Sequence, residues 1–120
     1  MSITGVHLLL YSPEAEALRA TLRDVFGWPF VGANPGWPIF ATPVAEMGIH
    51  PADSPGHEIS LMCDDLDSTV AELRSNGLEV KGLPEERRFG RAVTLLLPGG
   101  VEVLLCQPSH ASPIADEIPS

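Results

Sequence analysis

The stretch DDLDSTVAELRSNGLEV, residues 64–80, contains a helix with both of its ends marked. Acidic side chains at Asp64, Asp65 and Asp67 suit the positive start of a helix, and Gly77 supplies a left-handed residue that ends one. Between these ends, three apolar residues recur at the spacing of one helix face: Leu66, Val70 and Leu73. The stretch therefore predicts a helix with a single buried face.

Strands are predicted on both sides of this helix. An apolar run over 57–63 precedes it, and three strands follow it, near 78–81, 91–97 and 101–106. The Pro-Gly-Gly turn at 98–100 joins the last two strands as a hairpin. The order of elements in this half is therefore β, α, β, β, β.

The first half of the chain repeats this order. Residues 6–11 predict a strand, and Ser12 with Pro13 predicts the N-cap and first turn of a helix over 14–26 that Gly27 ends. Pro and Gly are frequent in the segment that follows, which excludes a helix and leaves three short strands, near 30, 39–41 and 45–50.

The repeated order predicts an α+β domain built from two tandem βαβββ modules. The modules cover about 3–52 and 56–108, and residues 109–120 form a C-terminal tail. With 120 residues, the chain has room for one domain and its hydrophobic core.

Composition limits the partners and the location of the protein. The formal net charge of −9 disfavours nucleic acid and anionic membranes as partners. The N-terminus has no signal-peptide pattern and no apolar run reaches the length of a membrane span, so we expect a cytoplasmic protein. Cys63 and Cys106 each lie in an apolar run, which predicts two buried free thiols.

Three stretches resemble the vicinal oxygen chelate superfamily, which contains glyoxalases, bleomycin resistance proteins and extradiol dioxygenases. They are RDVFGW at 23–28, DDLDSTVAELRSNGLEV at 64–80 and LPGGVEVLLCQP at 97–108. The resemblance implies that the two modules form a curled, half-open barrel sheet with the helices outside and a small-molecule cavity on the inner faces of the strands. It also implies a homodimer.

The resemblance further implies metal ligands on the first and fourth strands of both modules. Because side chains alternate along a strand, His7, Leu9 and Tyr11 share the predicted cavity face, while Leu8 and Leu10 pack beneath the helices. The same alternation places Glu46 with His50, and it places Glu102 toward the cavity. A complete metal set then consists of four residues: His7, Glu46, His57 and Glu102.

Two functional hypotheses follow. In the first, a divalent Zn, Ni, Mn or Fe ion in this set polarises substrate oxygens, and Glu102 or Glu46 acts as the general base of a lyase or dioxygenase reaction. In the second, the cavity of a metal-free protein binds a drug or an aromatic metabolite. Four further residues are candidates for substrate binding: Tyr11, His50, Glu58 and Arg91.

A competing register displaces the ligand set. An ungapped alignment of the last hairpin with the superfamily's pattern puts the ligand position at Leu104, one pleat beyond Glu102. The same shift puts Gly48 at the fourth-strand position and favours Glu58 over His57 as the inward residue. The sequence leaves both registers open.

Overall fold

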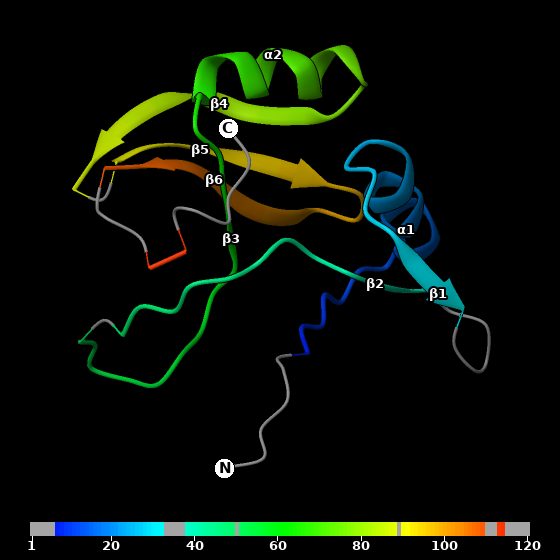
Figure 1. Cartoon of the computed structure of the whole chain (residues 1–120), viewed down its shortest axis with the longest axis horizontal. Helices are drawn as coiled ribbons and strands as arrows, with labels where there is room; N and C mark the ends of the chain where they lie inside the picture. Colours follow the sequence, from blue (N-terminus) through cyan, green and yellow to red (C-terminus); the bar gives the residue numbers. More distant parts are fainter. Residues whose placement is uncertain (1–6, 33–37, 50, 89, 110–112, 115–120) are drawn as a thin grey trace.

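The computed structural model describes residues 7–32, 38–49, 51–88, 90–109 and 113–114. Within these residues it contains helices and strands in an α+β arrangement (Figure 1). Their bounds are α1 Ala15–Asp24, β1 Phe30–Gly32, β2 Pro38–Phe40, β3 Ser60–Met62, α2 Leu66–Ser75, β4 Glu79–Arg87, β5 Gly90–Leu97 and β6 Val101–Pro108.

The second half forms the predicted βαβββ module. Its strands make a four-stranded sheet in the order β3-β6-β5-β4, in which β3 runs parallel to β6 and the other pairs are antiparallel. Parallel neighbours need a long crossover, and α2 belongs to the connection that leaves β3. The prediction for this module is confirmed.

Helix α2 begins and ends as its sequence predicts. The Asp65 carboxylate accepts a hydrogen bond from the Ser68 amide at 3.2 Å, and the Gln107 side-chain oxygen accepts one from the Leu66 amide at 2.8 Å. At the other end, Gly77 has φ +86°, a left-handed conformation that suits glycine. Gln107 therefore connects the start of the helix to β6.

The core lies between α2 and one face of the four-stranded sheet, and Figure 1 shows α2 lying across that face. Leu66 of α2 and Leu95 of β5 are both fully buried. The other buried members are Leu18, Val70, Leu78, Val93, Leu97, Val103 and Leu105. No helix of the described residues is long and apolar enough to cross a membrane.

Helix α1 contacts the second module at the turn between β5 and β6. The Ser12 hydroxyl donates to the Pro98 carbonyl at 2.7 Å, and the Gly99 amide donates to the Glu14 carboxylate at 2.8 Å. The helix begins at Ala15 with Glu14 as its N-cap, so the prediction that Ser12 is the N-cap is wrong by position. The Ser12 hydroxyl nevertheless accepts a hydrogen bond from the Glu14 amide at 3.0 Å, in the turn that leads into the helix. Leu18 joins the helix to the common core.

The first half departs from the prediction beyond α1. Strands β1 and β2 pair in antiparallel fashion, but the predicted strands at 6–11 and 45–50 are not formed over the described residues 7–11 and 45–49. Leu8 and Leu10, expected beneath the helices, are 47% and 38% exposed. A strand requires a neighbouring backbone to pair with, and the described part of this single chain does not pair with these two segments.

Truncation of a fully buried core side chain should strongly lower the stability of the protein. Replacing Leu95, which has no exposed surface, by alanine should lower the free energy of unfolding by about 3 kcal/mol, because it leaves a cavity. Leu83→Ala is the matched control: Leu83 is 78% exposed, and its truncation should change stability by less than about 0.5 kcal/mol. Urea denaturation measures both values, and equal effects would contradict the described core.

Candidate functional site

The face of the four-stranded sheet opposite α2, here called the inner face, carries the candidate site. Strand pairing aligns Leu104 of β6 with Ser60 of β3 and with Thr94 of β5, and it aligns Thr94 with Lys81 of β4. Side chains of paired residues point to the same side of a sheet, so these four residues form a row across the inner face. Glu102 and Cys106 lie two residues to either side of Leu104 along β6.

A hollow of about 320 Å³ opens at the start of β6. It is lined by Leu10, His57, Glu58, Ile59, Glu102, Val103 and Leu104. This volume lies at the small end of the range of organic ligand sites, and the lining combines leucine side chains with an imidazole and two carboxylates. Such a surface can cover an apolar molecule and orient one polar group of it.

The hollow brings together candidates from both registers. His57 and Glu58 both line it, so the structure does not choose between them by position alone. Ser60 and Met62 of β3 share a side with Leu104 and Cys106, and alternation carried back from Ser60 places Glu58 on the inner face. Leu10 also lines the hollow, although alternation in the sequence assigned it to the helix side.

Glu102 has an ion-pair partner that sequence reasoning missed. The Lys81 ammonium lies 3.4 Å from each carboxylate oxygen of Glu102. Lys81 lies on β4 and Glu102 on β6, so their side chains meet across β5, between the levels of Thr94 and Leu96. The side chain of Lys81 lies on the inner face because Lys81 pairs with Thr94 of β5. This pairing of β4 with β5 cannot be predicted from the sequence pattern.

Glu46 affects the thiol of Cys106 on β6 through its charge. Burial raises the pKa of the Cys106 thiol, and the negative charge of Glu46 raises that pKa further. Burial is also the main cause that raises the pKa of the Cys63 thiol, whose Sγ lies 3.6 Å from the Cys106 carbonyl oxygen. Both cysteines are free, Cys106 is buried and Cys63 half-buried, which agrees with the predicted pair of thiols.

The candidates His7 and Tyr11 do not lie at the hollow. His7 is exposed, and the Tyr11 side chain is 83% exposed. His50 lies outside the described residues. Neither His7 nor Tyr11 lines the hollow that contains Glu58 and Glu102.

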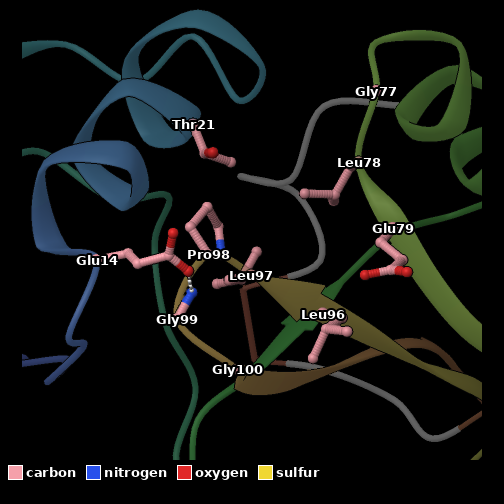
Figure 2. Close-up of a pocket in the computed structure, with 10 residues that line it drawn as sticks. All are labelled: Glu14, Thr21, Gly77, Leu78, Glu79, Leu96, Leu97, Pro98, Gly99 and Gly100. Atoms are coloured by element: carbon pink, nitrogen blue, oxygen red, sulfur yellow. Dashed lines mark hydrogen bonds between the residues drawn. The ribbon is translucent and has the colours of Figure 1, made fainter.

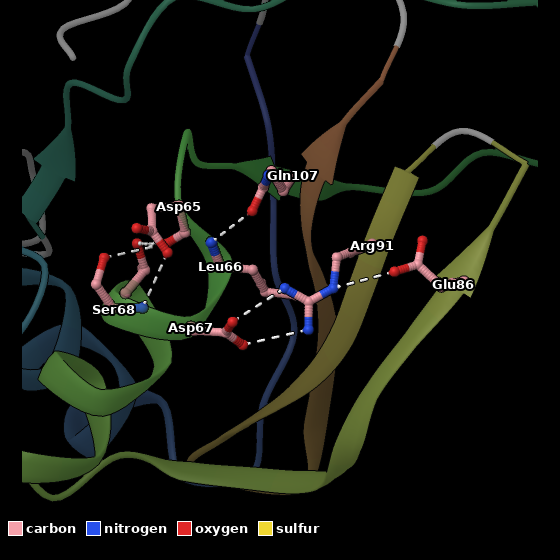
Figure 3. A network of polar contacts seen from close by, with 8 residues as sticks. Asp65, Leu66, Asp67, Ser68, Glu86, Arg91 and Gln107 are labelled. Atoms are coloured by element: carbon pink, nitrogen blue, oxygen red, sulfur yellow. Dashed lines mark hydrogen bonds and ion pairs between the residues drawn. The ribbon is translucent and has the colours of Figure 1, made fainter.

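Arg91 lies on the opposite side of the sheet from the expected one. Its guanidinium donates to both carboxylate oxygens of Asp67 at 3.2 Å and also pairs with Glu86 at 3.3 Å (Figure 3). The hydrogen bonds to Asp67 raise the pKa of Arg91 above its already high value. Arg91 therefore pairs with Glu86 on β4 and with the first turn of α2, away from the hollow beside Glu102.

The predicted metal set does not assemble in one chain. Among the described residues, no group of three or more His, Cys, Asp and Glu side chains is placed to hold a metal ion. The carboxylate of Glu102 faces the Lys81 ammonium, and His7 does not line the hollow that contains Glu102. Zinc and similar ions need three or four such donors at about 2 Å, so these residues do not fit the ion.

A second hollow, of about 310 Å³, lies between α1 and the turn that joins β5 to β6 (Figure 2). Its lining includes Glu14, Thr21, Leu78, Glu79 and the turn 98–100. The Glu14 carboxylate is held by the Gly99 amide, and a Cβ on Gly99 would meet the Ser12 hydroxyl. This hollow is therefore the joint between α1 and the second module.

Comparison with solved structures finds several chains of the same architecture. An antibiotic-binding protein, TnmS3, from Streptomyces sp. CB03234 is 26% identical, with a TM-score of 0.66 over 91% of this chain and 99% of that chain. A glyoxalase/bleomycin resistance protein/dioxygenase superfamily member from Sphaerobacter thermophilus is 23% identical, with a TM-score of 0.61 over 88% and 98%.

A fosfomycin resistance protein from Listeria monocytogenes, in complex with Mn(II) and a dihydroxypropylphosphonic acid, is 15% identical. Its TM-score is 0.61, and the match covers 97% of this chain and 99% of that chain. No protein-family model matches the chain, and no curated protein sequence matches it significantly.

Proposed function

Since the chain has the vicinal oxygen chelate fold of the glyoxalase, bleomycin resistance and dioxygenase superfamily, we propose that it binds a small, mainly apolar organic molecule on its inner face. The observation that carries this proposal is the hollow beside Glu102, in which apolar side chains surround a few polar groups. Leu10 and Leu104 would cover the apolar part of the molecule. His57, Glu58 and Glu102 would fix its orientation.

Binding is better supported than the enzymatic hypothesis. A lyase or dioxygenase reaction of the kind expected from the sequence needs a bound divalent ion, and the described residues of a single chain do not bring three ligands together. The structural neighbour with 26% identity is an antibiotic-binding protein, which supports capture of a small molecule as the function. Recognition of a drug or an aromatic metabolite in the cytoplasm is therefore the proposed role.

Compound binding should depend on Leu104. Thermal-shift screening of small aromatic compounds, followed by isothermal titration calorimetry, identifies a binder, and Leu104→Glu should weaken it at least tenfold. The substitution removes an apolar contact of about 1.5–3 kcal/mol and adds a carboxylate to an acidic hollow.

Leu83→Glu introduces the same chemical change at an exposed position outside the hollow, and it should leave binding unchanged. Circular dichroism checks that both variants are folded. Equal affinity of Leu104→Glu and wild type would contradict the proposed location of the site.

We further propose that the chain acts as a homodimer. The large hydrophobic side chains that are exposed in the described residues lie between 8 and 49, with the exception of Leu83: Leu8, Leu9, Leu10, Tyr11, Phe30, Val31, Ile39, Val44, Met47 and Ile49. Exposed large apolar side chains in this number are typical of a protein interface. The segments 7–11 and 45–49 also join no sheet within the described chain, so a second copy would give their backbones a neighbour.

Size-exclusion chromatography with light scattering tests the dimer. Wild type should have twice the 12.8 kDa mass of the chain, and Leu9→Asp should shift it toward the monomer because a charge would be buried in the interface. Leu83→Asp, a matched exposed position in the second module, should leave the mass unchanged. A wild type that is monomeric at all concentrations would reject the proposal.

A further inference from the structure

We infer that Lys81 is the fixed cation of the inner face, so that the site takes its ligand without a divalent metal. This inference rests on the proposed binding function, and it differs from what the resemblance implies for Glu102. The evidence for it is the set of residues that lie next to Glu102 and Leu104 on the inner face.

The row that contains Leu104 cannot hold a metal ion. It consists of Ser60, Leu104, Thr94 and Lys81, one residue from each strand. One alignment with the superfamily puts the ligand of the last strand at Leu104, and this position has a hydrocarbon side chain. Its neighbours in the row are two hydroxyls, which are weak ligands, and an ammonium, which repels a cation.

The other alignment puts the ligand at Glu102, whose carboxylate is already paired with a cation of the chain. Lys81 reaches across β5 and lies at the same distance, 3.4 Å, from both carboxylate oxygens. A divalent ion at Glu102 would have to displace this ammonium or lie next to it. In one register, then, a hydrocarbon side chain occupies the ligand position, and in the other an ammonium lies beside the ligand.

Besides Glu102, the possible metal donors that line the hollow in the described chain are His57 and Glu58. They lie beside a carboxylate that the Lys81 ammonium already pairs with.

The Lys81–Glu102 pair is suited to ligand exchange. Its side chains are 63% and 51% exposed, and ion pairs with this exposure contribute about 0–1 kcal/mol to stability. A ligand oxygen can therefore compete with Glu102 for the ammonium at little cost to the fold. The ligand class that fits is an apolar molecule with an acceptor oxygen, such as a carbonyl, carboxylate or phenolate, which the ammonium would bind.

Titration with metal salts alone tests the inference without an organic ligand. Untagged wild type, Lys81→Gln, Lys81→Arg and Lys81→Gln/Glu102→Gln are each titrated with MnCl₂, NiCl₂ and ZnCl₂ by isothermal titration calorimetry. Wild type and Lys81→Arg should show no saturable site. Lys81→Gln should bind at least one of the three ions, because a repelling charge next to Glu102 is removed. Its dissociation constant should be about tenfold lower than the highest value that the titration can detect. The double variant should lose this gain.

Two results would overturn the inference. One is a wild type that binds one metal ion per chain at a site that Glu102→Gln removes. The other is a Lys81→Gln protein whose titrations equal those of wild type, since Lys81 would then not be what opposes the ion. Neither result depends on the organic compound, so failure of the proposed binding function is detected separately, in the compound screen.

Discussion

Val103 and Leu105 of β6 pack beneath α2 together with Leu66, and this contact fixes the direction of every side chain in the strand. Because the alternation has a period of two, burial of these residues turns Glu102, Leu104 and Cys106 to the opposite face. A shift of one residue would expose the core residues and bury the carboxylate. The position of the acidic hollow is therefore a consequence of the hydrophobic core.

The two faces of the sheet differ in how far they are covered. The core side is closed by α2, whereas the row from Ser60 to Lys81 has no helix over it in the described structure. An uncovered sheet face with an ammonium and carboxylates keeps its charges in contact with water, which avoids the high free-energy cost of burying them unpaired. The same exposure leaves these groups accessible to a ligand.

The sequence predicted best the elements whose signals are local. The spacing of Leu66 and Val70, the acidic start of α2 and Gly77 at its end correctly defined the helix, and the Pro-Gly-Gly turn correctly placed the β5–β6 hairpin. The strands expected at 6–11 and 45–50 failed over their described residues, because strand formation depends on a neighbour that the local pattern does not specify.

Within the candidate site, the sequence could predict only the side-chain directions that follow from alternation along a single strand. Glu102 was placed on the inner face correctly, but its partner Lys81 depends on how β4 aligns with β5. The position of Arg91 likewise depends on the β4 partner Glu86 and on Asp67 of α2. These contacts join elements distant in the sequence, so residue type and spacing alone could not supply them.

We propose that ligands bind on the inner face and do so without metal. A ¹⁵N–¹H correlation spectrum of the protein, recorded with EDTA during titration with a compound that binds, tests this proposal. Amide shifts should be concentrated at residues 57–60 and 102–104, which border the hollow beside Glu102. Shifts confined to the joint between α1 and the second module, at Glu14, Thr21 and 77–79, would contradict it, as would binding that EDTA abolishes.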